Sequence, residues 1–203
     1  DPAAPSGGEP DADVLRVDPP ARPELIDQYL SNGMGKRSAE ADFGAGAESV
    51  HDLVASADVV LHGYRPGALA RFGLEPETLA QRYPALIIAE LSAWGGHGPW
   101  ATSPGFDSIV QAASGIAMVC AEDGRPGALP VQALDHASGY LMAAEVMTML
   151  ARGEAGVIST SLTGAARTLL SLPRRRPVDP APPPVSTVAV RSPYGELRAV
   201  PPP

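Results

Sequence analysis

The amino-terminal half of the chain alternates short apolar runs with stretches of helical periodicity, and this alternation constrains the fold more than any other feature. We predict three strands, DVLRV (13–17), DVVLHGY (58–64) and ALIIAELSAW (85–94), and two helices, AESVHDLVASA (47–57) and EPETLAQRYP (75–84). Strand, helix and strand at this spacing predict right-handed βαβ units. Nearly continuous apolar runs are typical of strands covered on both faces. The predicted fold class is therefore α/β with a parallel sheet.

The second half begins with the loop GGHGPWATSPG (95–105), which leaves the last of these strands. We predict helices from Phe106 to about Ser114 and from about His136 to Arg152, and then a strand that passes into a helix over residues 156–172. Ligands of open α/β sheets bind at the carboxyl ends of the strands. We therefore expect a binding site around this glycine-rich loop.

Composition shifts divide the chain into four parts. We predict a flexible leader (1–11), a main domain (12–172), a proline-rich linker (173–185) and a β segment (186–203) with a hairpin around Pro193-Tyr194-Gly195. The leader runs straight into the first predicted strand with no element before it. We therefore expect a truncated or naturally shortened form of a longer fold.

Charge and cysteine content exclude several classes of protein. The net charge is −8, and the basic residues are scattered apart from Arg174 to Arg176, so we expect no nucleic-acid partner. The single cysteine, Cys120, lies in an apolar run and is expected to be a buried, inert thiol. No apolar run approaches the roughly 20 residues of a membrane span, and the start does not resemble a signal peptide. We expect a cytoplasmic protein with no membrane partner.

The stretch HGYRPGALARFGL (62–74) places two arginines after a predicted strand end. The planar guanidinium groups of Arg65 and Arg71 suit phosphate groups. A solvated turn with two unpaired arginines is an equally good interpretation of this spacing alone.

Two aspartates stand at predicted helix starts, in PGFDSIVQAASG and VQALDHASGY. Asp107 falls early in its helix, where a carboxylate is favoured by unpaired amides, and capping is the simpler interpretation. Asp135 is likewise interpreted first as an N-cap, with His136 as a surface residue. Because apolar residues flank Asp135, partial burial is expected to raise its pKa. The local pattern leaves the choice between cap and catalyst open.

The sequence lacks the motifs that several enzyme classes require. There is no Gly-x-Gly-x-x-Gly and no Walker loop, and the four histidines lack metal-ligand spacing, so we expect no metal site. Ser92 and Ser114 do not lie in a nucleophile-elbow context.

Seven stretches, taken in order, resemble the class III CoA-transferase family, which includes formyl-CoA and carnitine CoA-transferases and α-methylacyl-CoA racemases. They are ADVLRVDPP, NGMGKRSAEAD, ADVVLHGYRPGALARFGL, YPALIIAELSAWGGHGPW, PGFDSIVQAASG, DGRPGALPVQALDHASGYLMAAEVMTML and VISTSLTGAARTLL. Together they cover most of the chain from Ala12 to Leu172. Seven ordered matches are far more specific than any one of them.

The resemblance implies a Rossmann-like, CoA-binding parallel-sheet domain over residues 12–172, in a homodimer whose two chains interlock. It implies that the substrates are an acyl-CoA and a carboxylic acid. The family's catalytic aspartate falls on Asp135. The family's CoA-contacting residues fall on Gly63, Tyr64, Arg65 and Arg71, and the segment at the thioester end falls on Pro104, Gly105, Phe106 and Asp107.

The chemistry that the resemblance implies gives Asp135 a definite task. Moving CoA between two acids without losing the thioester energy needs a carboxylate that becomes a mixed anhydride and then an aspartyl-CoA thioester. Backbone amides near Gly95, Gly96 and Gly115 are candidates to hold the thioester oxygen.

The sequence also departs from the family. Pro19 replaces a usual basic residue, the segment Ala41 to Gly44 lacks a lysine that contacts CoA, and the small second domain is expected to be missing or reduced. Two alternatives to a transferase therefore stay open. One is a shortened homologue or subunit that binds CoA without turnover. The other is an acyl-CoA racemase, which the phenylalanine at position 106 disfavours because racemases carry a histidine there.

Overall fold

The computed structural model describes residues 12–21, 24–44, 46–173, 186–192 and 195–199. The chain forms two compact units, residues 1–171 and residues 172–203. The predicted leader and almost all of the predicted proline-rich linker lie outside the described residues.

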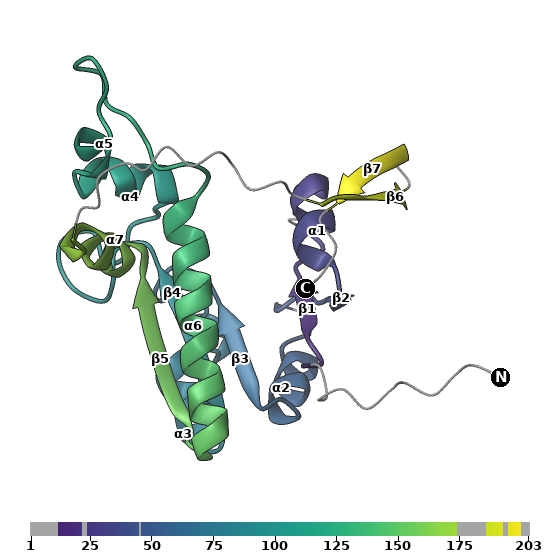
Figure 1. Cartoon of the computed structure of the whole chain (residues 1–203). Coiled ribbons are helices and arrows are strands. Elements are labelled where there is room, and N and C mark those ends of the chain that lie inside the picture. Colours follow the sequence, from purple (N-terminus) through teal and green to yellow (C-terminus); the bar gives the residue numbers. More distant parts are fainter. Residues whose placement is uncertain (1–11, 22–23, 45, 174–185, 193–194, 200–203) are drawn as a thin grey trace. The chain divides into compact units, whose positions relative to one another are not determined.

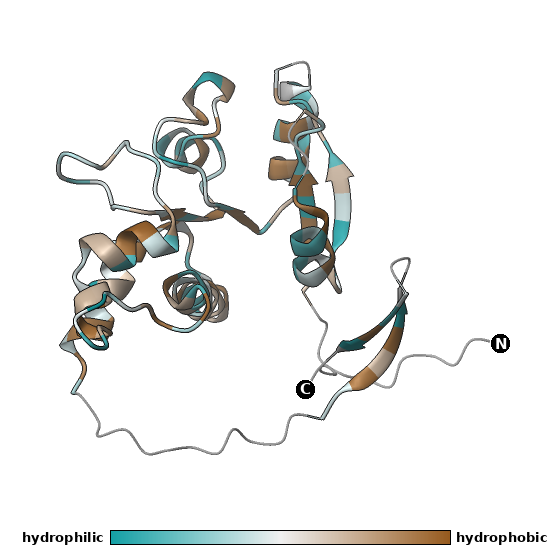
Figure 2. Ribbon diagram, turned by 90° about the horizontal axis from the view of Figure 1, so that it is seen from above, coloured by the Kyte–Doolittle hydropathy of each residue, from teal (hydrophilic) through white to brown (hydrophobic). Residues whose placement is uncertain are grey.

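A three-stranded parallel sheet forms the centre of the larger unit (Figure 1). Its strands lie side by side in the order β3 (Val59–His62), β4 (Ile87–Ser92) and β5 (Gly156–Ser161). In register, His62 lies opposite Glu90, and Glu90 lies opposite Ser159. Ile87, Ile88 and Ala89 of β4 are buried. Figure 2 shows hydrophobic colour on the central strands and also on the helices around them. The predicted parallel arrangement is confirmed for the strands at 58–64 and 85–94, whereas the first predicted strand, β1, does not belong to this sheet.

A second parallel pair forms nearer the amino terminus. Strand β1 (Leu15–Asp18) pairs with β2 (Arg37–Glu40), and the helix α1 (Ile26–Gly33) connects them. The sequence analysis predicted only the first of these three elements. The polar sequences IDQYLSNG and RSAE carry too few apolar residues for periodicity to reveal a short helix or strand.

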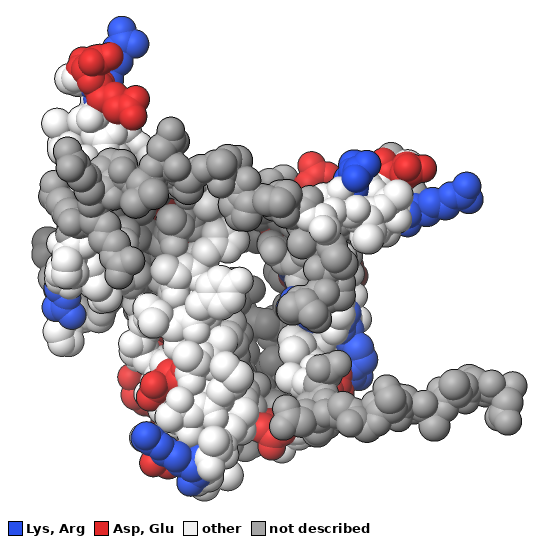
Figure 3. Space-filling model, in the orientation of Figure 1, with Lys and Arg blue, Asp and Glu red and all other residues white. Residues whose placement is uncertain are grey.

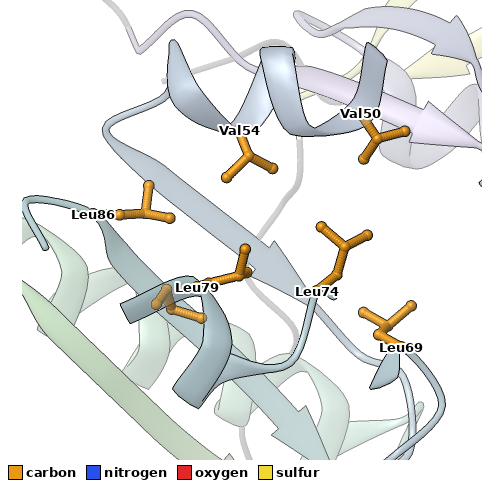
Figure 4. Close-up of a cluster of buried hydrophobic side chains, with 7 residues drawn as sticks. Val50, Val54, Leu69, Leu74, Leu79 and Leu86 are labelled. Atoms are coloured by element: carbon orange, nitrogen blue, oxygen red, sulfur yellow. The ribbon is translucent and has the colours of Figure 1, made fainter. Parts of the chain in front are cut away.

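One hydrophobic cluster packs against one side of the central sheet (Figure 4). Helix α2 (Ala47–Ala55) contributes Val50 and Val54, and helix α3 (Pro76–Arg82) contributes Leu79. Proline at the first position of α3 suits a helix start because it lacks only an N–H that the first turn leaves unpaired. The remaining members of the cluster are Leu69, Leu74, Leu86 and Ile88.

A second cluster joins the helices that follow the loop after β4. It is formed by side chains from α4 (Asp107–Ala113), α5 (Ile116–Val119), α6 (Ala133–Arg152) and α7 (Leu162–Ser171). Its members are Val110, Ile116, Leu134, Leu162, Ala165 and Ala166. Because Leu134 is 1% exposed, this cluster fixes the first turn of α6 in place.

Helix boundaries in this region differ from the prediction. Helix α6 begins at Ala133, three residues before the predicted start, and the short helix α5 was not predicted. Of the described helices, α6 is the longest with 20 residues, and none is both long and apolar enough to cross a membrane.

The smaller unit contains a two-stranded antiparallel hairpin. Strand β6 (Val188–Ser192) pairs with β7 (Gly195–Ala199), in agreement with the predicted hairpin. The turn residues Pro193 and Tyr194 lie outside the described residues.

Candidate active site

The candidate site lies at the edge of the sheet where the parallel strands end. Strands β3 and β4 are parallel neighbours, so the loop that begins with Gly63 and the loop that begins with Ala93 leave the same edge. Thr163, at the start of α7, donates its backbone N–H to the Ala93 carbonyl at 3.1 Å. Figure 1 shows α4 beyond the tips of β4 and β5, and α6 starting at the same edge. The topology therefore gathers the predicted loops as expected.

Asp107 is the most deeply buried acid of this region. It is the first residue of α4 and is 2% exposed. Its Oδ2 accepts hydrogen bonds from the backbone N–H groups of Leu134 (2.8 Å) and Asp135 (3.2 Å). These are unpaired amides of the first turn of α6, so Asp107 caps a helix that begins 26 residues later in the chain. Asp107 lies in the first turn of α4, where a carboxylate suits the helix dipole, but its capping hydrogen bonds go to α6 and not to its own helix.

Asp135 is the third residue of α6 and is partly buried. The N-cap position belongs to Gln132, so the interpretation of Asp135 as an N-cap is wrong. Its side chain forms no hydrogen bond within the part of the chain that the structure describes, since only its backbone N–H contacts Asp107. One carboxylate caps the helix, and the other is left free.

The surroundings of Asp135 favour its neutral form. Burial raises the pKa of its carboxyl above the ordinary value of 3.8, and the negative charge of Asp107 raises it further. The neighbouring His136 lowers this pKa, but its effect is the smallest of the three. The expectation that partial burial raises this pKa is supported. A carboxylate with a raised pKa is a better base and nucleophile once it is ionised.

The residues after β3 form an exposed turn. Gly63, Tyr64 and Arg65 are exposed, and the Ala68 N–H donates to the Arg65 carbonyl at 3.0 Å. Arg71 lies in the 3-10 helix η1 (Ala70–Phe72), with its guanidinium carbon 4.5 Å from the centre of the Phe72 ring. Neither guanidinium forms an ion pair with any described carboxylate. Both arginines are therefore available to an anionic ligand.

The segment before α4 packs tightly on the end of β4. Trp94 donates its indole N–H to the Pro104 carbonyl at 3.3 Å. A Cβ on Gly105 would lie 2.5 Å from the Ala93 Cβ and 2.8 Å from the Trp94 Nε1, so only glycine fits there. Phe106 follows with its side chain 71% exposed. The segment thus presents an exposed aromatic ring next to the buried Asp107.

The three glycines that were candidate oxyanion donors differ in their N–H groups. Gly95 donates to Ser92 Oγ at 3.1 Å, and Gly115 donates to the Ala112 carbonyl at 3.3 Å. The N–H of Gly96 has no hydrogen-bond acceptor among the described residues. Two of the three donors are thus already engaged in local turns, and Gly96 is the one available to a substrate oxygen.

A small hollow borders the glycine-rich loop. It has a volume of about 180 Å³ and is lined mainly by Trp94, His97, Trp100, Ser114 and Thr163. The two tryptophan rings lie with their centres 4.9 Å apart. This hollow could not be predicted from sequence patterns, because the residues that line it come from three separate segments.

Gln111 is a buried polar residue that the sequence analysis missed. It is 3% exposed and donates its side-chain N–H to Asp107 Oδ1, while its Oε1 accepts the Leu129 N–H at 2.8 Å. The only sequence signal is its position four residues after Asp107, on the same face of a helix.

His62 is a second polar residue without an assigned role. Both of its ring nitrogens are buried and have no hydrogen-bond partner among the described residues. Burial lowers the pKa of this imidazole, and the charge of Glu90 on the next strand opposes that effect. Glu90 itself accepts a hydrogen bond from Ser159 Oγ at 2.6 Å. Within the described residues, no cluster of three or more His, Cys, Asp or Glu side chains could hold a metal ion.

Comparisons with known proteins agree with this architecture. Residues 9–174 match the family model described as CoA-transferase family III. The probable fatty acyl-CoA transferase Rv3272 of Mycobacterium tuberculosis is 37% identical over 151 residues, which are 73% of this chain and 38% of that protein. The succinate–glutarate CoA-transferase of Agrobacterium fabrum is 34% identical over 125 residues, which are 60% of this chain and 31% of that protein. The chain therefore spans less than half the length of these two relatives.

Solved structures give the same result. A crystal structure of Rv3272 from M. tuberculosis matches with a TM-score of 0.70 and 33% identity, covering 78% of this chain and 48% of that chain. A CAIB/BAIF family protein from Brucella suis matches with a TM-score of 0.66 and 25% identity, covering 91% of this chain and 57% of that chain.

Proposed function

Because the chain belongs to CoA-transferase family III, we propose that it forms the CoA-binding and nucleophile-bearing part of an enzyme that moves CoA between carboxylic acids. The donor is an acyl-CoA thioester, the acceptor is a free acid, and Asp135 is the nucleophile. One observation carries this proposal. Asp107 caps α6, so the carboxylate of Asp135 has no structural task and can react.

The proposed reaction passes through two kinds of covalent intermediate. A carboxylate oxygen of Asp135 attacks the thioester carbonyl, the C–S bond breaks, and CoA leaves as a thiolate from a mixed anhydride. The thiolate then attacks the Asp135 carbonyl of the anhydride, which forms aspartyl-CoA and releases the first acid. The acceptor carboxylate then attacks the carbonyl of aspartyl-CoA, the C–S bond breaks, and a second anhydride and CoA thiolate form. The thiolate attacks the acceptor carbonyl of this anhydride, the C–O bond breaks, and the new acyl-CoA leaves while the Asp135 carboxylate is regenerated.

The neighbouring groups suit the charges that develop in this reaction. Arg65 and Arg71 form no ion pair with any of the described residues and lie at the edge where the strands end, so they would hold the phosphates of CoA together with Gly63 and Tyr64. Pro104, Gly105 and Phe106 would line the thioester end. The N–H of Gly96, which has no acceptor in the described part of the chain, would donate to the thioester oxygen as negative charge forms there.

Proton transfer at the α-carbon is the alternative chemistry, and the residue at position 106 argues against it. A racemase of this family needs a histidine in the position of Phe106. A phenyl ring cannot carry a proton, and the adjacent Asp107 is committed to three hydrogen bonds. These observations support transfer rather than racemisation.

The proposal includes a homodimer that works in the cytoplasm. Large apolar side chains along α6 support a protein partner at this helix, since Tyr140 is 80%, Leu141 55% and Met147 62% exposed. Figure 3 shows that the surface over α6 carries few charged groups.

A transfer assay with Asp135→Asn tests the proposed function. Formation of a new acyl-CoA is followed by chromatography with several acyl-CoA donors and acids, and the variant should lose at least about a thousandfold in kcat. A wild-type chain that binds CoA but yields no product with any pair would instead support a binding homologue without turnover. Full activity in the variant would exclude Asp135 as nucleophile.

A further inference from the structure

A buried hydrogen-bond chain joins Gln111 to the backbone on both sides of the loop before α6. The Gln111 Oε1 accepts the Leu129 N–H at 2.8 Å, and its Nε2 donates to Asp107 Oδ1. Asp107 Oδ2 in turn accepts the amides of Leu134 and Asp135. Two side chains of α4, one helical turn apart, therefore hold residue 129 and residues 134–135 at the same time.

The orientation of the Gln111 amide is dictated by its partners. The Leu129 backbone N–H can only donate, so the amide oxygen of Gln111 must face it and the amide nitrogen must face Asp107. All three groups that contact the Asp107 carboxylate are then N–H donors. The two carboxylate oxygens can accept all three hydrogen bonds.

The segment between the two anchors is strained. Val131 adopts a φ of +53°, although it is β-branched, and its side chain is 77% exposed. A β-branched residue in the left-handed region is a genuine outlier and persists only where its surroundings enforce it. Because the Val131 side chain is mostly exposed, the hydrogen bonds at Leu129, Leu134 and Asp135 are the contacts that can hold this segment.

We propose that Gln111 is a positioning residue for Asp135, because it orients Asp107 and closes the clamp that holds the strained loop and the first turn of α6. Gln111 touches neither substrate nor reacting atoms and acts only through Asp107 and the Leu129 backbone. The inference rests on the proposed role of Asp135. The clamp itself, however, can be measured without any transfer activity.

The ionisable groups around Gln111 are few. Asp107 lies on its own helix, and Asp135 and His136 lie on α6. Helix α5 has no ionisable residue, and α7 contributes the exposed Arg167. A new titrating group at position 111 would therefore interact mainly with Asp107.

The substitution Gln111→Glu makes the hydrogen bond to Asp107 depend on pH. A protonated glutamic acid can still accept the Leu129 N–H and donate its own proton to Asp107, so the clamp survives at acidic pH. Once ionised, the new carboxylate has no proton to donate and repels Asp107. We expect kcat within about threefold of the wild type at acidic pH and at least about tenfold below it at alkaline pH.

Two further variants complete the experiment. Gln111→Leu cannot bond either partner, so it should lower kcat at every pH and leave KM for acyl-CoA within about threefold. The exposed Gln81→Glu on α3 is the matched control and should keep the wild-type pH profile. Thermal unfolding at each pH confirms that the proteins compared are folded.

Hydrogen exchange separates the clamp from the chemistry. In Gln111→Leu, and in Gln111→Glu at alkaline pH, the amides of Leu129, Leu134 and Asp135 should exchange at least about tenfold faster than in the wild type. Wild-type exchange at these amides together with a wild-type pH profile in Gln111→Glu would overturn the inference. If these amides exchange faster in the Gln111 variants but Asp135→Asn keeps full transfer activity, the clamp is confirmed and only the proposed function is refuted.

Discussion

Asp107 and Asp135 share one hydrogen bond, in which the backbone N–H of Asp135 donates to the Asp107 carboxylate at 3.2 Å. This bond divides the work of the two acids. Asp107 is buried and holds the start of α6, whereas Asp135 keeps its own carboxylate free and partly exposed to solvent. The same proximity raises the pKa of Asp135, because two negative charges lie close together. Structure and reactivity at this helix start are therefore coupled.

Removal of the Asp107 carboxylate should destabilise the fold. In Asp107→Ala the amides of Leu134 and Asp135 and the side chain of Gln111 lose their buried acceptor. We expect the free energy of unfolding to fall by about 2–3 kcal/mol, measured by urea denaturation. Asp52→Ala, an exposed acid on α2, is the control and should change it by less than about 0.5 kcal/mol. Equal stability of the two variants would show that the cap contributes nothing.

The pH dependence of transfer should report the ionisation of Asp135. Because burial and Asp107 raise its pKa above 3.8, the acid limb of kcat/KM should lie above the range of an ordinary aspartate, with activity rising as pH increases. In Asp107→Asn the neighbouring charge is absent, so this limb should move to lower pH. A limb that stays in place would assign it to another group.

The same raised pKa has a consequence for stability with a defined sign. The folded state holds the Asp135 proton more tightly than the unfolded chain, so this contribution is fully present below pH 3.8 and is lost as pH rises through the folded-state pKa. Asp135→Asn should therefore raise the melting temperature at neutral pH and leave it unchanged in strong acid. The rise should be below about 3 °C, because much of the carboxyl remains hydrated.

The two arginines at the strand ends should act on CoA binding. We expect Arg65→Ala and Arg71→Ala each to raise KM for acyl-CoA about tenfold and to leave kcat nearly unchanged. Arg82→Ala is the matched control, since Arg82 ends α3, just before the amino end of β4, at the opposite edge of the sheet. A loss confined to kcat would place the arginines at the reacting centre instead.

A substitution at Gly105 tests how closely the loop before α4 approaches the end of β4. In Gly105→Ala the new methyl group would collide with the Ala93 Cβ and the Trp94 ring, so unfolding should become easier by about 1–3 kcal/mol. Gly139 lies within α6 with nothing within 4 Å of an added Cβ, and Gly139→Ala should instead stabilise the chain by about 0.5–1 kcal/mol. Destabilisation of the two variants to the same extent would contradict the packing described for Gly105.

The sequence predicted those parts of the fold that depend on local pattern. Apolar runs identified β3 and β4 and their parallel arrangement, and residues 156–172 were predicted as a strand that passes into a helix. Burial on both faces holds only for the start of β4, whereas β3 and β5 are partly exposed. Periodicity failed at α1 and β2, whose sequences are polar and short. It also placed the start of α6 three residues too late, because Asp135 has the chemistry of an N-cap.

The sequence predicted the individual acidic residues of the site, but not the hydrogen bonds that join them. The resemblance selected Asp107 and Asp135, yet capping rules assigned each acid to its own helix. The actual cap joins residues 27 and 28 positions apart, and no local rule links them. Gln111 was not predicted for the same reason, since one of its two hydrogen-bond partners, Leu129, is 18 residues away.

Isotope transfer to Asp135 tests the central claim most directly. The protein is incubated with an acyl-CoA and an acceptor acid carrying ¹⁸O in its carboxyl group, then digested and analysed by mass spectrometry. If the acceptor forms an anhydride with Asp135, one labelled oxygen stays on the aspartate after the new thioester leaves, and the peptide with Asp135 gains about 2 Da. New acyl-CoA formed with no label on that peptide would contradict nucleophilic catalysis by Asp135.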